Sequence, residues 1–167
     1  MATITFKKET LVNVKGQLPT VGSVAPDLSL VKGDLSEIKL SELKGKNIVL
    51  NIFPSLDTGV CAASVRRFNK EASNLPNTVI LAVSADLPFA SQRFCTTEGI
   101  ENVIPVSVFR NPEFAEKYGV LMIDGPLKGL LARAVVVIDT EGKIKHTELV
   151  PEIAQEPNYQ IAISSIV

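Results

Sequence analysis

A strand pattern, a helix pattern and a second strand pattern follow one another directly, and this order most constrains the fold. Residues 47–53 read as a buried strand that Pro54 ends. From Gly59 to Leu75, apolar residues recur three or four positions apart, as on the buried face of a helix. Residues 78–84 return to a strand pattern. The order strand, helix, strand implies parallel neighbouring strands joined by a right-handed crossover, so these three elements predict an α/β sheet.

The rest of the chain extends this sheet. The other predicted strands span residues 3–6, 11–14, 28–31, 38–40, 103–109, 134–139 and 143–149. The other predicted helices span residues 87–98 and 112–118, and a last one opens at Pro157. Asp86 is placed to cap the first of these helices. We expect a mixed central sheet, helices on both faces and an N-terminal β-hairpin. A thioredoxin-like layout fits this order, although periodicity does not separate it from other α/β sandwiches.

Size and charge narrow the class of protein. The chain has 167 residues, and we expect a single domain over 1–167. Seventeen basic and eighteen acidic residues leave a net charge of −1, so no strong field favours nucleic acid or a membrane as partner. Residues 1–8 lack the apolar segment of a secretory signal, and we expect a cytoplasmic protein. Two cysteines in a reducing compartment are redox-active, catalytic or inert rather than a permanent disulfide.

Cys61 is the candidate nucleophile. The segment 53–61 joins the buried strand to the helix, at the strand end where α/β active sites gather. If Thr58 is the N-cap, Cys61 is the third helical residue, close to free backbone N–H groups and the positive end of the helix dipole. That position favours a thiolate, which is the form that attacks a peroxide.

Two neighbours of Cys61 each allow two interpretations. The Thr58 hydroxyl can cap the helix, or it can accept a hydrogen bond from a peroxide while donating one to the thiolate. Pro54 can simply end the strand, or it can hold the loop rigid and shield the sulfur from water.

Arg133 interrupts the apolar run 130–138. A cation there is costly unless it is paired or reaches water. It can extend outward from an edge, or it can lie beside Cys61 and stabilise both the thiolate and the charge developing on the leaving oxygen. Spacing alone does not bring the two residues together.

Cys95 lies in the last turn of the predicted helix 87–98. It is either an inert buried side chain or a thiol that local unfolding of the helix end can release. It stands 34 positions after Cys61, which is not the Cys-x-x-Cys spacing of dithiol exchange. His146 is the only histidine, and we expect it to face solvent without a role. No metal-ligand spacing, phosphate loop or dinucleotide fingerprint is present, so we expect neither metal nor cofactor.

The motif residues resemble a known family. Pro54, Thr58 and Cys61 match the peroxiredoxin motif Pro-x-x-x-Thr-x-x-Cys. Longer strings are similar to the bacterial thiol peroxidases, often called Tpx, within the peroxiredoxins. These strings span residues 51–66, 84–90, 93–95, 124–130 and 132–139. The resemblance covers nearly the whole chain.

The resemblance implies a peroxidase that reduces hydrogen peroxide and alkyl hydroperoxides to water and alcohols. It implies that Cys61 becomes a sulfenic acid and that Cys95 resolves it as an intramolecular disulfide. Thr58 and Arg133 match the residues that activate the thiolate and polarise the peroxide, and Pro54 belongs to the same substrate pocket. Thioredoxin as reductant and a homodimer are also implied.

Two other functions remain as alternatives. One is a redox sensor or holdase on the same fold, although a sensor needs no peroxide pocket. The other is a thioredoxin-like disulfide reductase, which the cysteine spacing disfavours.

Overall fold

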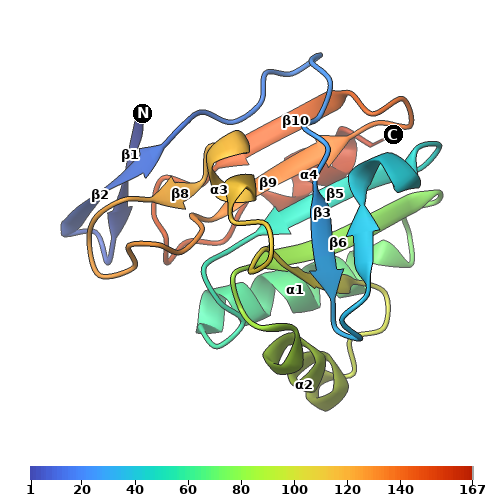
Figure 1. Cartoon of the computed structure of the whole chain (residues 1–167), viewed down its shortest axis with the longest axis horizontal. Coiled ribbons are helices and arrows are strands. Elements are labelled where there is room, and N and C mark those ends of the chain that lie inside the picture. Colours follow the sequence, from blue (N-terminus) through green and yellow to red (C-terminus); the bar gives the residue numbers. More distant parts are fainter. Residues whose placement is uncertain (167) are drawn as a thin grey trace.

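Two parallel strand pairs form the centre of the main sheet. The computed structural model describes residues 1–166 and is shown in Figure 1. Its seven-stranded sheet has the order β10-β9-β5-β6-β7-β3-β4. The strands are β3 (Ser29–Lys32), β4 (Glu37–Lys39), β5 (Asn47–Ile52), β6 (Thr78–Ser84), β7 (Ile104–Ser107), β9 (Ala134–Ile138) and β10 (Ile144–Leu149). The β5–β6 and β6–β7 pairs are parallel, and β9 and β10 add antiparallel strands at one edge, as predicted.

A smaller sheet packs beside the main one. The predicted N-terminal hairpin is β1 (Ala2–Phe6) and β2 (Thr10–Lys15), and β2 pairs with β8 (Leu121–Met122) in the order β1-β2-β8. The sequence did not predict β8, because two residues are too short to show alternation.

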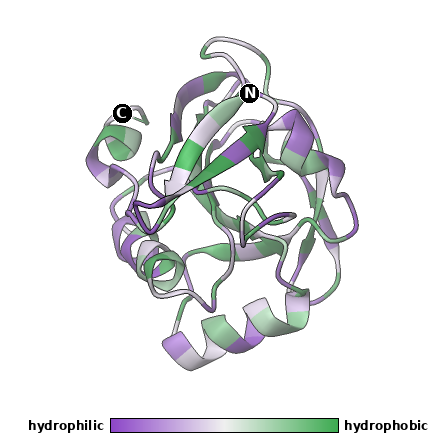
Figure 2. Ribbon diagram, turned by 90° about the vertical axis from the view of Figure 1, so that its left-hand side faces the viewer, coloured by the Kyte–Doolittle hydropathy of each residue, from purple (hydrophilic) through white to green (hydrophobic). Residues whose placement is uncertain are grey.

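Helices cover both faces of the main sheet. They are α1 (Gly59–Ala72), α2 (Pro88–Glu98), α3 (Glu113–Lys117) and α4 (Tyr159–Ser164), with a 3₁₀-helix η1 at Leu40–Leu43. One apolar cluster joins β5, β6 and β9 to α1, α2 and α4, and the other joins the opposite face to α3 and the small sheet. Figure 2 shows hydrophobic residues along the central strands, while the helices carry both kinds. This arrangement confirms the predicted thioredoxin-like layout.

Helix α1 buries the face that its periodicity predicts. Cys61, Val65 and Phe68 are fully buried, and Phe68 meets Tyr159 of α4 edge to face with ring centroids 5.2 Å apart. The helix ends three residues earlier than predicted, but Leu75 remains buried in the turn that follows. Burial of this face, more than intrinsic propensity, stabilises α1 against the sheet.

The expectation that His146 faces solvent was wrong. A register shift between Ile144 and His146 interrupts the alternation of β10, so the imidazole is half-buried instead of facing solvent. Its Nε2 atom is buried and has no hydrogen-bond partner within residues 1–166.

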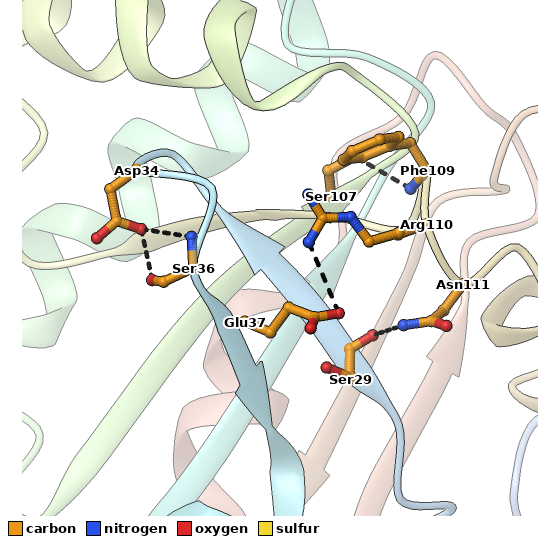
Figure 3. Close-up of polar contacts among 8 residues, drawn as sticks. All are labelled: Ser29, Asp34, Ser36, Glu37, Ser107, Phe109, Arg110 and Asn111. Atoms are coloured by element: carbon orange, nitrogen blue, oxygen red, sulfur yellow. Dashed lines mark hydrogen bonds and ion pairs between the residues drawn. The ribbon is translucent and has the colours of Figure 1, made fainter.

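The other edge of the sheet is joined to the loop after β7, as Figure 3 shows. The Asn111 side chain donates to the Ser29 carbonyl at 2.6 Å, and Arg110 pairs with Glu37 at 3.9 Å. Asp34 only accepts hydrogen bonds from Ser36 within its own turn. None of the described helices is long and apolar enough to cross a membrane. Residues 1–166 contain no cluster of three or more His, Cys, Asp or Glu that could hold a metal ion.

Candidate active site

Cys61 lies in the first turn of α1. Thr58 is the N-cap residue with an extended backbone, so Cys61 is the third residue of the helix. The first backbone bond runs from the Ala62 N–H to the Thr58 carbonyl at 3.0 Å. The N–H groups before Ala62 therefore point to the helix N-terminus without carbonyl partners inside the helix. Their partial positive charge favours an anion at the buried Cys61 sulfur.

Arg133 meets Cys61 inside the protein. Its Nη2 donates to the Cys61 Sγ at 3.2 Å, and its Nε donates to the Ile153 carbonyl at 2.9 Å. The side chain is only 1% exposed, so the alternative in which it reaches out to solvent is wrong. Its Nη1 is buried and has no partner within the described residues. One guanidinium thus contacts the sulfur and keeps a second donor free beside it.

Strand register explains this contact between residues 72 positions apart. β9 runs antiparallel to β5, with Ala134 paired to Ile52. Arg133 precedes Ala134, and the loop to Cys61 follows Ile52, so both reach the same end of the sheet. The sequence could not supply this register.

The Thr58 hydroxyl does not cap α1. It donates to the Ser55 carbonyl at 3.0 Å, and the Thr58 backbone N–H bonds the same carbonyl at 3.2 Å. Both bonds close a tight turn between Pro54 and the helix. Thr58 is exposed at this turn, whereas Pro54 is buried. The capping interpretation is therefore wrong, because the Thr58 hydroxyl bonds a carbonyl of the preceding loop and no N–H group of the helix.

Asp86 anchors this loop, and its predicted role as a helix cap was wrong. The N-cap of α2 is Leu87, without a side-chain cap bond. The Asp86 carboxylate instead accepts from the Ser55 hydroxyl at 2.7 Å, the Leu56 N–H at 2.8 Å and the Ser84 hydroxyl at 3.0 Å. The Ser55 and Leu56 donors reach Asp86 only because the folded chain brings their loop next to it. The pattern Ser84-x-Asp86 at a strand end was the available signal.

A buried polar chain lies under the first turn of α1. The Asn51 side chain donates to the Ser64 hydroxyl at 3.1 Å, which donates to the Cys61 carbonyl at 2.8 Å. Asn51 and Ser64 are both fully buried. Sequence reasoning missed this connection, although a polar residue inside a buried strand was a usable signal. It joins the cysteine's backbone to β5.

Cys95 lies in α2 and is 7% exposed. Both cysteines are free and belong to the same apolar cluster. Burial raises the pKa of the Cys95 thiol to about 11. In this closed state Cys95 is therefore a protonated thiol and a poor nucleophile.

Sequence comparison identifies the family. Residues 20–163 match the Redoxin family. The chain is 54% identical over 166 residues to the thiol peroxidase of Mycobacterium tuberculosis (strain ATCC 25618 / H37Rv), and the match covers 99% of each protein. The chain belongs to the thiol peroxidases of the redoxin family. It is therefore a peroxidase, an oxidoreductase, and the resemblance seen in the sequence is confirmed.

Solved structures agree with this family. A peroxiredoxin-like protein from Aquifex aeolicus superimposes with a TM-score of 0.92 at 41% identity, covering 98% of this chain and 95% of that one. A thiol peroxidase from Chromobacterium violaceum shares the fold, with a TM-score of 0.88 at 19% identity and coverage of 95% and 91%. In this thiol peroxidase, the buried Cys61 sulfur therefore lies in contact with a buried cation, Arg133.

Proposed function

We propose that this thiol peroxidase reduces hydroperoxides with the thiolate of Cys61 and closes its cycle through Cys95. The observation that carries the proposal is the contact of 3.2 Å between the Arg133 Nη2 and the Cys61 sulfur, with the Nη1 left without a partner among the described residues. A fixed cation next to a sulfur at a helix N-terminus suits a nucleophile that must be an anion.

The first step transfers one oxygen. The Cys61 thiolate attacks the terminal oxygen of R–O–OH, the O–O bond breaks, and the sulfur becomes S–OH. The alkoxide that leaves takes a proton from solvent and becomes an alcohol, or water when the substrate is hydrogen peroxide. The free Nη1 of Arg133 can donate to the oxygen on which charge develops. The Thr58 hydroxyl borders the same turn, and the buried Pro54 limits access of water to the sulfur.

The second step forms the disulfide. The Cys95 sulfur attacks the sulfenic sulfur, water leaves, and the Cys61–Cys95 bond forms. In our scheme the first turn of α1 and the last turn of α2 both open, which lets the two Cα atoms reach the separation of less than about 7 Å that a disulfide needs. Once released from burial, the Cys95 thiol regains its ordinary acidity and becomes a better nucleophile.

The remaining features complete the proposal. A thioredoxin-type dithiol reduces the disulfide, and hydrogen peroxide and alkyl hydroperoxides are the substrates. We place the cycle in the cytoplasm, where such reductants maintain free thiols, and treat residues 1–167 as one domain. Exposed Leu87 at the N-cap of α2, Phe89 in α2 and Phe109 after β7 support a homodimer, because a partner subunit could cover such apolar side chains.

The intact mass of the reduced protein after one equivalent of cumene hydroperoxide tests the scheme. We expect a rapid loss of two hydrogens, which is absent in Cys61→Ser. The Cys95→Ser variant should gain one oxygen, complete one turnover and fail to cycle with thioredoxin. Sustained thioredoxin-driven cycling by Cys95→Ser would refute the resolving role. An unchanged mass in the unaltered protein would refute the proposal as a whole.

A further inference from the structure

Helix α2 is fastened at both ends, by different groups. At its start, the Asp86 carboxylate binds the loop that precedes Cys61. At its end, Arg66 of α1 donates to Glu98 through two parallel bonds, from Nε at 3.0 Å and from Nη2 at 2.9 Å. This two-bond geometry is the strong form of an arginine–carboxylate pair. Its mutual support lowers the pKa of Glu98 and raises that of Arg66.

A second contact from α1 holds the chain just beyond α2. The Asn69 side-chain oxygen accepts from the N–H groups of Glu101 at 3.2 Å and Asn102 at 2.8 Å. Arg66 and Asn69 lie three positions apart in α1, so they project from the same face of the helix. Together they grip the last turn of α2 and the residues that follow it.

Cys95 lies in the helix turn that these contacts hold in place. It lies three positions before Glu98, and its carbonyl accepts the N–H bonds of Gly99 and Ile100 that end the helix. Unwinding of the last turn of α2, which would release the Cys95 thiol, disrupts these terminal bonds. Helix ends normally open at low cost. Here the opening must also break the contacts to Arg66 and Asn69.

We propose that Arg66, Asn69 and Glu98 form a clasp that controls the release of Cys95 and thereby the rate of disulfide formation. The inference deepens the two-cysteine cycle proposed above and rests on it. None of the three residues contacts the Cys61 sulfur in the polar contacts of residues 1–166, so the clasp acts on the second step and not on peroxide attack. These are positioning residues for the resolving thiol.

The clasp has a chemical consequence for Cys61. While Cys95 remains buried, the Cys61 sulfenic acid persists, and a second peroxide can oxidise it to sulfinic acid. A weaker clasp shortens the lifetime of the sulfenic acid. The Arg66 and Glu98 side chains are half-exposed, which limits the strength of the pair. We therefore expect removal of the pair to accelerate opening by about two- to fivefold.

The first experiment measures opening without any peroxide chemistry. In a Cys61→Ser background, Cys95 is the only thiol, and its labelling by N-ethylmaleimide at neutral pH reports how often the helix end opens. Glu98→Gln and Asn69→Ala should each increase the labelling rate by about two- to fivefold. High salt should accelerate labelling of the Cys61→Ser parent, through screening of the ion pair, but not of the Glu98→Gln variant.

A matched control comes from the same helix. Arg67 and Glu71 form an exposed pair at 3.0 Å inside α1, four positions apart, and make no bond to α2. Glu71→Gln makes the same chemical change in a single-bond pair of the same helix and should leave the labelling rate unchanged. Equal acceleration by Glu71→Gln and Glu98→Gln would overturn the clasp, as would no acceleration by Glu98→Gln.

The second experiment follows oxidation with both cysteines present. After a pulse of cumene hydroperoxide, rapid quenching and intact mass separate sulfenic acid, disulfide and sulfinic acid. Glu98→Gln should form sulfenic acid at the unaltered rate, form disulfide about two- to fivefold faster and accumulate less sulfinic acid. An unchanged disulfide rate would overturn the clasp. If no variant forms a disulfide, the two-cysteine cycle itself fails, and the labelling result still judges the clasp on its own.

Discussion

Replacement of Arg133 by methionine separates the catalytic role proposed for this cation from its cost to stability. The guanidinium is buried, bonded to the Cys61 sulfur at 3.2 Å and to the Ile153 carbonyl at 2.9 Å, with Nη1 unpaired among the described residues. A charged hydrogen bond contributes about 1.5–3 kcal/mol, which corresponds to about 10- to 150-fold in rate. A donor to developing oxyanion charge contributes about 10²–10³-fold. Since both act through one group and do not add fully, we expect a loss of at least about 100-fold.

Stability should respond differently from rate. Methionine replaces a buried cation that lacks a full set of hydrogen-bond partners. This replacement by itself raises the free energy of unfolding. It also leaves the Ile153 carbonyl without its donor, which costs about 1–3 kcal/mol. These two effects oppose each other, so the free energy of unfolding should change by no more than about 2 kcal/mol. The expected signature is a large loss of rate in a protein that remains folded.

Rapid quenching, thiol alkylation and intact mass give the second-order rate constant for the first step, since the chain has no tryptophan to report it by fluorescence. Urea unfolding gives the stability. Arg110→Met is the control, because Arg110 is half-exposed, makes the long pair with Glu37 seen in Figure 3 and lies over the Phe109 ring, away from Cys61. A peroxide rate within a few-fold of the unaltered protein would refute the reasoning. If Arg133→Met loses activity because it is unfolded, the expectation that the two stability effects nearly cancel is wrong.

Asp86→Asn should slow the first step by about 5- to 30-fold, because the Pro54–Thr58 loop loses a charged hydrogen-bond acceptor. Asp34→Asn is the control and should not slow it, because the partners of Asp34 lie within its own turn. Rapid quenching measures the rate of the first step in both variants. The free energy of unfolding should fall as pH rises from about 9 to about 11, since burial raises the pKa of Cys95 and the folded state holds that proton more tightly than the unfolded chain. Stability from this thiol is present below pH 9, and urea curves for Cys95→Ser should lack its share of the fall; identical pH dependence in both proteins would contradict the burial argument.

Local patterns predicted the elements that carry the cysteines. The strand over residues 78–84 has the bounds that periodicity predicted, and α1 begins at Gly59 as expected. The position of Cys61 in the first turn follows from that start alone. Cys95 likewise lies in the last turn of α2 because Pro88 and Gly99 mark the ends of that helix. Such signals are local, since turn and cap residues act within one or two turns.

Contacts between distant segments were not predictable in this way. Arg133 had two interpretations in the sequence, and only the antiparallel register of β9 on β5 places it against the Cys61 sulfur. Asp86 was expected at a helix cap, yet the approach of the Pro54–Thr58 loop supplies better donors. Local sequence patterns were enough to place most of the strands and helices and to locate Cys61 in the first turn of its helix. The charged and polar groups around Cys61 follow from tertiary packing instead, because partners 30 to 72 residues apart meet only when strand register and helix packing bring them together.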